Sequence, residues 1–209
     1  LARGLGQAHA RGVTHRDLSP DNVILRHDRV EEAVLIDFGI ARSTELGDGL
    51  AGRFAGKFKY IAPEQLGHYD GAIGPQTDIY GLALLMTAVL RGKPLEMGDS
   101  VVTASDARQQ IPDLSGLSHR MFPLLQYMLE PDPAHRPADM GQIVAMLDDP
   151  MRIPARYRLP LWSGQNAAPS PDGHTTGISE TPFGLPLAAE QAVTAPADSA
   201  IAQAEPKKR

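Results

Sequence analysis

The longest apolar stretch of the chain is DIYGLALLMTAVL, from Asp78 to Leu90. Its hydrophobic positions cover nearly every face of a helix, which is typical of a helix buried on all sides. The stretch is shorter than the roughly 20 residues that a helix needs to cross a bilayer, and it begins with a charged residue. We therefore predict a buried core helix rather than a membrane span, with Gly92 just past its end.

Shorter patterns predict a few further elements. Residues 1–10 are expected to be the end of a helix, with Gly12 as its left-handed stop. The β-branched runs VIL at 23–25 and AVLI at 33–36 are separated by the polar stretch RHDRVEE, which predicts a β-hairpin. Two more helices are expected, at about residues 118–129, ended by Pro131, and at about residues 138–147. This part of the chain is therefore predicted to be mainly α-helical with one small hairpin.

The composition changes near residue 150. Nine of the 18 prolines lie in the last 60 residues, among Ala, Ser, Thr and Gly, and the periodic apolar pattern ends there. Such a segment buries too little surface to offset the entropy cost of ordering it. We expect one domain over residues 1–150 and a disordered, Pro/Ala-rich tail over residues 151–209, of which YRLPLW at 157–162 could dock back.

Charge and composition exclude several classes of function. The net charge of −5 argues against nucleic acid as a partner, and the lack of cysteine argues against disulfides and Cys-based zinc sites. The seven histidines include no i,i+4 pair that would suit a metal on a helix. No secretory leader pattern opens the chain, and its first residue is Leu1. We expect a piece of a longer or processed cytoplasmic protein, which sequence beyond Arg209 could tether to a membrane.

The stretch HRDLSPDN, residues 15–22, carries the chemistry. It precedes the predicted hairpin, and DFG at 37–39 follows the hairpin. Because a hairpin returns its two ends to the same place, we expect Asp17, Asn22 and Asp37 to converge. Their carboxylate and amide oxygens suit Mg²⁺, and one carboxylate would orient a hydroxyl nucleophile. These are the requirements of phosphoryl transfer from a nucleotide.

The same residues resemble the protein kinase pattern H-R-D-L-x-x-x-N, followed by D-F-G and by APE at 62–64. TDIYGLALLMTAVLRGKP resembles the central helix of that family, and PDPAHRP at 131–137 resembles its closing motif. Over about residues 1–150, the chain resembles the C-terminal lobe of a bacterial, eukaryotic-type Ser/Thr protein kinase. The resemblance implies ATP and Mg²⁺ as cofactors and proteins as substrates.

The resemblance also implies a role for each matching residue. Asp17 would be the catalytic base, and Asn22 and Asp37 would bind the metal and the cofactor. Asp78 would hold the catalytic loop from below, and Arg16 would reach the activation segment at 37–64. The residues with regulatory or structural roles are Arg16, Phe38, Gly39, Glu64, Asp78 and Arg136, of which Glu64 and Arg136 would form an ion pair.

Two positions depart from the family pattern. Ser19 stands where the Ser/Thr branch usually has a lysine that neutralises the transferring phosphoryl group, and Lys57 stands where it usually has a threonine. The two places face each other across the catalytic site in the family. We expect an exchange in which Lys57 supplies the ammonium group that Ser19 lacks; otherwise Lys57 is solvated and Ser19 marks weakened catalysis. The departures also blur the preference for Ser/Thr over Tyr acceptors.

The activation segment departs in a further way. The stretch ELGDGLAGRFAGKFK at 45–59 contains no Ser, Thr or Tyr. We expect Glu45 or Asp48 to pair with Arg16 where many kinases use a phosphorylated residue. The alternative is that Ser43 or Thr44, just before the stretch, is the regulatory site.

The Gly-rich loop, lysine and partner glutamate of the family's N-terminal lobe have no counterpart in these residues. We therefore expect the N-terminal lobe of the same chain as a partner, and no activity from this segment alone. Two alternatives remain open. One is a pseudokinase that acts as a binding or regulatory module, although the complete set of Asp17, Asn22 and Asp37 favours an enzyme. The weaker one is a small-molecule phosphotransferase, which APE and the 131–137 motif disfavour.

Overall fold

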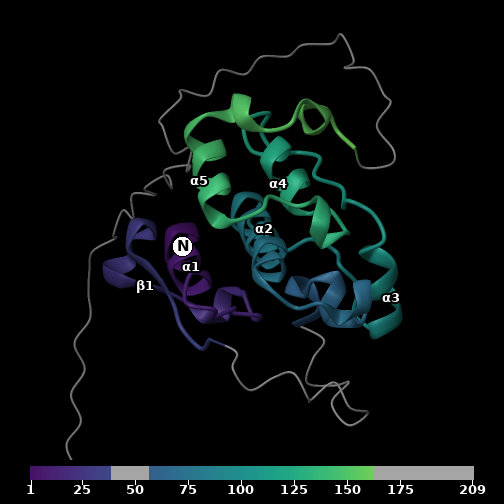
Figure 1. Cartoon of the computed structure of the whole chain (residues 1–209), viewed down its shortest axis with the longest axis horizontal. Coiled ribbons are helices and arrows are strands. Elements are labelled where there is room, and N and C mark those ends of the chain that lie inside the picture. Colours follow the sequence, from purple (N-terminus) through teal and green to yellow (C-terminus); the bar gives the residue numbers. More distant parts are fainter. Residues whose placement is uncertain (39–56, 162–209) are drawn as a thin grey trace, which may run out of the picture. The chain divides into compact units, whose positions relative to one another are not determined.

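A computed structural model describes residues 1–38 and 57–161 (Figure 1). The helices are α1 (Ala2–His9), α2 (Pro75–Arg91), α3 (Val101–Ala107), α4 (Phe122–Met128) and α5 (Met140–Asp148), and the strands are β1 (Val23–Leu25) and β2 (Ala33–Leu35). Short 3-10 turns connect them: η1 (Pro20–Asn22), η2 (Arg26–Asp28), η3 (Val30–Glu32), η4 (Lys57–Tyr60), η5 (Pro63–Leu66), η6 (Tyr69–Gly71), η7 (Pro133–His135), η8 (Pro150–Arg152) and η9 (Ala155–Arg158). The prediction of a mainly helical protein with one small hairpin is therefore confirmed.

Helix α2 is the central element of the described residues. It begins with Pro75, and the Thr77 side chain accepts a hydrogen bond from the Gly74 amide at 3.1 Å. It ends at Arg91 and is followed by Gly92, which has a φ of 69° and so takes the left-handed conformation that glycine favours. The predicted burial on all sides holds for most of the helix but is wrong for its last turn, where Val89 and Leu90 are exposed.

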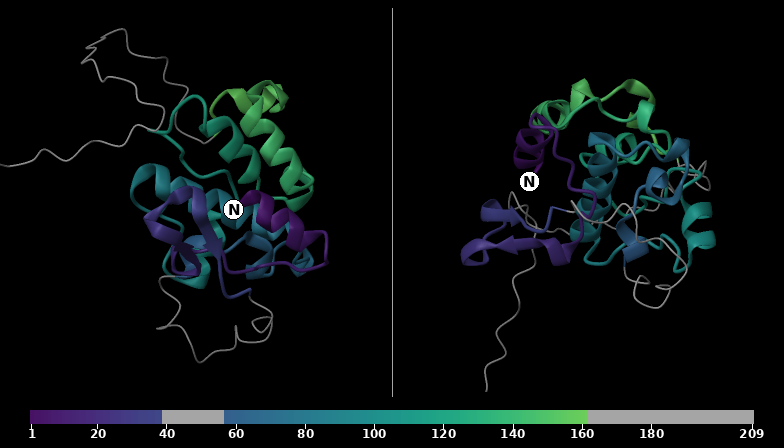
Figure 2. Two further views of the ribbon diagram at one scale, coloured as in Figure 1. Left: turned by 90° about the vertical axis from the view of Figure 1, so that its left-hand side faces the viewer. Right: turned by 60° about the horizontal axis from the view of Figure 1, so that its bottom comes forward.

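The other helices pack around α2 and bury one shared core. Helix α2 contacts α1 and α4, and α5 packs against α1, as Figures 1 and 2 both show. The core side chains include Leu5, Ile79, Leu82, Leu84, Leu124, Leu125, Met140 and Ile143. Each fully buried side chain of this kind contributes on the order of 1.5–3 kcal/mol to folding, so this core fixes the ends of the helices that position the site.

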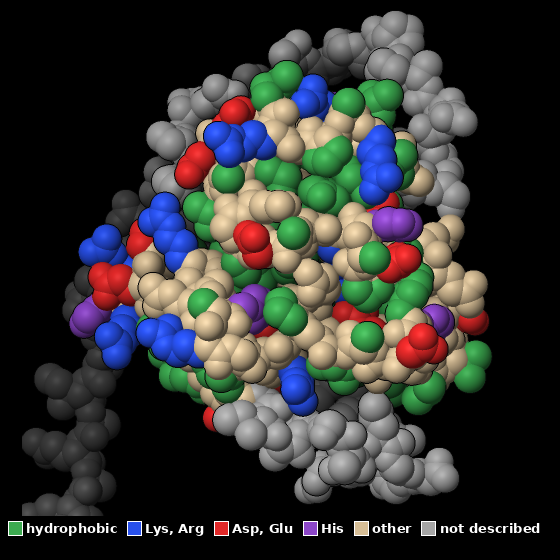
Figure 3. Space-filling view, in the orientation of Figure 1, with side chains coloured by type: hydrophobic (Ala, Val, Ile, Leu, Met, Phe, Trp, Pro, Cys, Tyr) green, Lys and Arg blue, Asp and Glu red, His purple; other side chains and the backbone are tan. Residues whose placement is uncertain are grey.

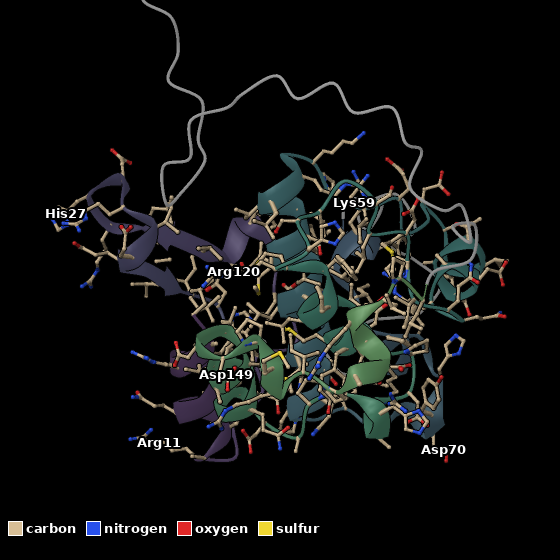
Figure 4. The ribbon with its side chains drawn as sticks, turned by 90° about the horizontal axis from the view of Figure 1, so that it is seen from above. Arg11, His27, Lys59, Asp70, Arg120 and Asp149 are labelled. Carbon is tan, nitrogen blue, oxygen red and sulfur yellow. The ribbon has the colours of Figure 1, made fainter. Side chains whose placement is uncertain are left out.

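The hairpin has the predicted position in the chain. Strands β1 and β2 are antiparallel, and the Cα partners Val23–Leu35, Ile24–Val34 and Leu25–Ala33 define their register. The tip of the hairpin, at His27, projects away from the helices (Figure 4). Charged side chains of both signs gather over this tip (Figure 3), where His27 and Arg29 pair with Glu32. The tip is thus solvated, whereas the open ends of the hairpin reach the helices.

Residues that follow α5 also pack against the helices. The fully buried Gln126 of α4 donates through Nε2 to the carbonyls of Tyr157 and Leu159, the latter at 2.7 Å, and accepts from the Leu161 amide at 3.1 Å. Ile153 and Tyr157 are buried. The remainder of the predicted tail, residues 162–209, lies outside the described residues. Within residues 1–38 and 57–161, no helix has the length and apolar character to cross a bilayer.

Candidate active site

Asp78, in the first turn of α2, binds the backbone of the HRD loop. Its side chain is fully buried. Its Oδ2 accepts a hydrogen bond from the His15 amide and its Oδ1 accepts one from the Arg16 amide, both at 2.7 Å. His9 of α1 also contacts Oδ2 through Nε2 at 2.7 Å. Because a buried carboxylate is stabilised only by such donors, α1, α2 and the loop are fixed together at this point.

The backbone of the loop is unusual at Arg16. Its φ is 69°, in the left-handed region that non-glycine residues seldom adopt. Such a conformation costs roughly 1–3 kcal/mol and persists where the surroundings enforce it. The Asp78 bond to the Arg16 amide provides that enforcement, and the strained residue directly precedes Asp17.

His15 joins this loop to the end of β2. Its ring is fully buried, its Nδ1 accepts from the Asp17 amide at 3.3 Å, and its Nε2 lies 3.0 Å from the Ile36 carbonyl oxygen. These partners assign the proton to Nε2, which then donates to Ile36. The ring also contacts Phe38, with 4.6 Å between ring centroids. His15 therefore packs and hydrogen-bonds between the HRD and DFG stretches.

Asn22 makes the second connection between these stretches. Its side-chain Nδ2 donates to the Asp17 carbonyl oxygen at 2.7 Å, and its own carbonyl accepts from the Ile36 amide at 3.0 Å. Asn22 is buried, Asp17 is half-buried and Asp37, with a φ of 54°, is exposed. The hairpin thus brings Asp17 and Asn22 next to the residue that precedes Asp37.

The oxygen donors at this place suit Mg²⁺. Because the Asn22 side-chain nitrogen donates to the Asp17 carbonyl, the side-chain oxygen is the atom that Asn22 can offer to a metal. Residues 1–38 and 57–161 contain no group of three His, Asp or Glu side chains that could hold a metal by themselves. Mg²⁺ is usually held by one or two carboxylates together with substrate phosphates, so the donor set fits this ion better than it fits zinc.

Glu64 and Arg136 form a buried ion pair. Arg136 donates through Nη1 to Glu64 Oε1 at 2.8 Å and through Nη2 to Oε2 at 3.0 Å, and neither side chain is exposed. The guanidinium group also lies over the Tyr80 ring, 4.7 Å from its centroid. It donates further to the carbonyls of Glu130, Pro131 and Gln76. The pair therefore ties APE to the start of α2 and to the 131–137 motif.

Two side chains that the sequence did not single out also organise the site. Gln65 donates through Nε2 to the Arg16 carbonyl at 2.8 Å, and the buried Arg108 binds the backbone of residues 58 and 61. Gln65 directly follows APE and Arg108 lies in a stretch without a motif, and the place of each in the fold reveals its partners.

Some of the expected site residues are not placed. The Lys57 side chain, Gly39 and the candidate regulatory residues Ser43, Thr44, Glu45 and Asp48 lie outside the described residues. Ser19 is half-buried just before η1, and its carbonyl accepts from the Asn22 amide at 3.1 Å.

Comparison with known proteins agrees with this geometry. A sequence model of the protein kinase domain matches residues 1–148. Serine/threonine-protein kinase PknD of Mycobacterium tuberculosis is 30% identical over 195 residues, which cover 88% of this chain and 29% of PknD. PknL of the same species is 29% identical over 161 residues, which cover 75% of this chain and 39% of PknL. PknH of Mycobacterium bovis is 37% identical over 109 residues, 49% of this chain and 17% of PknH. The chain thus spans less than half the length of these relatives.

Proposed function

Because the chain belongs to the protein kinase family, in its bacterial, eukaryotic-type Ser/Thr branch, we propose that the protein transfers a phosphoryl group from Mg-ATP to a protein hydroxyl. The observation that carries this proposal is the position of Asn22. Its two hydrogen bonds join the loop at Asp17 to the strand end at Ile36, directly before Asp37. The base and the metal-binding oxygens of a phosphotransferase are needed at one such place.

In this mechanism Asp17 orients the acceptor hydroxyl and takes its proton. The hydroxyl oxygen forms a bond to the γ-phosphorus, the bond from that phosphorus to the bridging β-γ oxygen breaks, and ADP leaves. Asn22 and Asp37 would hold Mg²⁺, which neutralises negative charge on the phosphates. Positioning by the buried Asp78 and His15 keeps the loop ready before the substrates arrive.

Lys57 is proposed to supply the positive charge near the transferring group. Ser19 carries no charge, and Lys57 begins η4, the turn that leads into the APE stretch. The backbone amide of Ala62 and the Arg16 carbonyl are both bound by Gln65, so APE and the catalytic loop are neighbours. This proximity supports an exchange of roles between positions 19 and 57.

The described residues are proposed to be the C-terminal lobe of the kinase, with an N-terminal lobe of the same chain as their partner. The hairpin supports this assignment, because the paired residues Ile24 and Val34 are 49% and 38% exposed beside the proposed nucleotide site. Exposed apolar groups at such a place suit contact with a nucleotide base and with a second lobe. This segment alone is therefore proposed to lack activity.

Labelled ATP tests the proposal. The full-length protein, incubated with γ-labelled ATP, Mg²⁺ and a generic protein substrate, is expected to label the substrate or itself, whereas the Asp17→Asn variant should lose the transfer. The Asp28→Asn variant, changed at the exposed tip of the hairpin, is the control and should behave like wild type. A wild-type protein that binds ATP but labels nothing would instead indicate the binding-module alternative.

A further inference from the structure

Arg108, at the end of α3, donates hydrogen bonds from its one guanidinium group to four backbone carbonyls. Nε donates to the Ile61 oxygen at 2.6 Å, and Nη1 donates to the oxygens of Met97 at 2.8 Å and Ala104 at 2.7 Å. Nη2 donates to the Phe58 oxygen. The residue has no exposed surface. Three separate segments, residues 58–61, the loop after α2 and α3 itself, are therefore joined at one side chain.

Burial of the Arg108 charge costs free energy, because the guanidinium group leaves water. Within the described part of the chain, the acceptors of these bonds are neutral carbonyls rather than a carboxylate, so dipoles alone offset the burial of the charge. Burial lowers the pKa of Arg108, while the nearby Tyr80 acts in the opposite direction. Only the planar, forked guanidinium reaches all four oxygens, and a lysine ammonium in this place has three donors at a single point.

The backbone is shaped around this contact. Gly98 has a φ of +82°, and a Cβ atom on it would lie 2.4 Å from the Ala104 nitrogen. The loop after α2 is thus pressed directly against α3, which brings the neighbouring Met97 carbonyl to Arg108. Such close approach is possible only for glycine.

The segment that Arg108 holds borders the catalytic loop. A Cβ on Gly81 of α2 would lie 3.3 Å from Leu18 Cβ and 3.6 Å from the Tyr60 carbonyl oxygen, so these two residues cover the same spot on α2. Burial, and then the charge of Asp21 in η1, raise the pKa of Tyr60, which also places it near the loop. Residues 58–61 therefore border the loop that carries Asp17.

We propose that Arg108 is a positioning residue that fixes residues 58–61 as one wall of the acceptor site. The proposal rests on the function proposed above. Because the four bonds involve only the side chain of Arg108 and backbone carbonyls, they need no phosphorylated residue. Helix α3 holds this wall whether or not the activation segment is modified. Loss of the wall should weaken binding of the acceptor while leaving the nucleotide site intact.

Kinetics of the full-length protein test this role. Arg108→Lys should raise KM for an acceptor peptide by about tenfold, the effect of losing one hydrogen bond to a charged group, with KM for ATP and peptide-independent ATP hydrolysis unchanged. Arg91→Lys is the matched control, because Arg91 makes an exposed hydrogen bond to the Asp113 carbonyl at 3.2 Å. Equal changes in the two KM values, or a change in kcat alone, would overturn the proposal.

Limited proteolysis tests the positioning without any activity. Trypsin cleaves after Lys59, which lies in η4 within the held segment (Figure 4), and after the exposed Arg29, in the connection of the hairpin. In Arg108→Lys, cleavage after Lys59 should become about tenfold faster while cleavage after Arg29 stays unchanged. A parallel rise at both sites would reveal general unfolding and would refute a local role. If the wild type transfers no phosphate, the proposed function fails, while this proteolysis result still decides whether Arg108 holds the segment.

Discussion

Gln65 Nε2 lies 2.8 Å from the carbonyl oxygen of Arg16, so one side-chain amide joins the APE stretch to the HRD loop. The side-chain oxygen of Gln65 accepts a hydrogen bond from the backbone N–H of Ala62 at 3.0 Å. The donor and the acceptor of the group are therefore both used, and its orientation is fixed by its partners. Any movement of APE is transmitted to the residue before Asp17.

The substitution Gln65→Glu removes one of the two hydrogen bonds and keeps the other. Glutamate retains the oxygen that accepts from Ala62 but has no N–H to donate to the Arg16 carbonyl. It also places a negative charge beside a carbonyl oxygen. We expect kcat to fall by about tenfold, the effect of one lost hydrogen bond with an unpaired acceptor, while the protein remains folded. Steady-state kinetics of the full-length protein measure this. Gln76→Glu is the control, because Gln76 donates to the Ala138 carbonyl on the surface, and an equal loss there would contradict the account.

Lys57→Ala should lower turnover by about 10²-fold, the scale of losing one preorganised group that stabilises charge in the transition state. The double variant Ser19→Lys with Lys57→Thr should recover much of the loss, since it restores the usual arrangement of the family. Turnover is measured at saturating ATP and acceptor. Unchanged turnover in Lys57→Ala would refute the exchange, whatever the double variant does.

The buried pair of Glu64 and Arg136 governs stability. Glu64→Gln leaves the Arg136 guanidinium buried beside a neutral amide, and we expect the free energy of unfolding to fall by about 3–5 kcal/mol. Chemical denaturation of the full-length protein gives this value. The reference variant is Glu31→Gln, whose carboxylate is exposed and lies 3.8 Å from Arg29, and which should cost less than about 1 kcal/mol. Similar losses in both variants would contradict the structural role of the pair.

The lack of hydroxyl residues at 45–59 predicts that activation does not require phosphorylation in that stretch. A fixed carboxylate, Glu45 or Asp48, carries about one negative charge where a phosphate carries about 1.5 to 2, and should still pair with Arg16. Phosphatase treatment of the full-length protein should therefore leave its activity unchanged. A large loss that ATP reverses, and that Thr44→Ala or Ser43→Ala abolishes, would show that the regulatory site lies there instead.

The sequence predicted the elements that depend on local patterns. The all-round apolar stretch gave α2, and the two β-branched runs gave the hairpin that brings Asn22 to Ile36. The last turn of α2 differs, because no neighbouring element within the described residues covers Val89 and Leu90. A pattern of residue types cannot reveal where a covering neighbour ends.

The parts that were not predicted depend on contacts between distant residues. Helix α3, VVTASDA, has no strong apolar face, and Ser100 caps it by accepting from the Thr103 amide at 3.2 Å. Arg108 and Gln126 are buried polar residues, which composition alone would place at the surface. Their backbone partners become acceptors only after the chain has folded, so no motif marks them.

Transfer by an Asp37→Asn variant tests the central claim most directly. Asn tolerates the positive φ of this position, so the change removes a negative charge with little backbone strain. Asp28→Asn, at a similar φ of 55° in the exposed hairpin connection, is the matched control. With γ-labelled ATP and Mg²⁺, the account predicts that Asp37→Asn in the full-length protein loses at least about 10³-fold in transfer, while Asp28→Asn keeps the wild-type rate. Equal transfer by wild type and Asp37→Asn would contradict the assignment of this site.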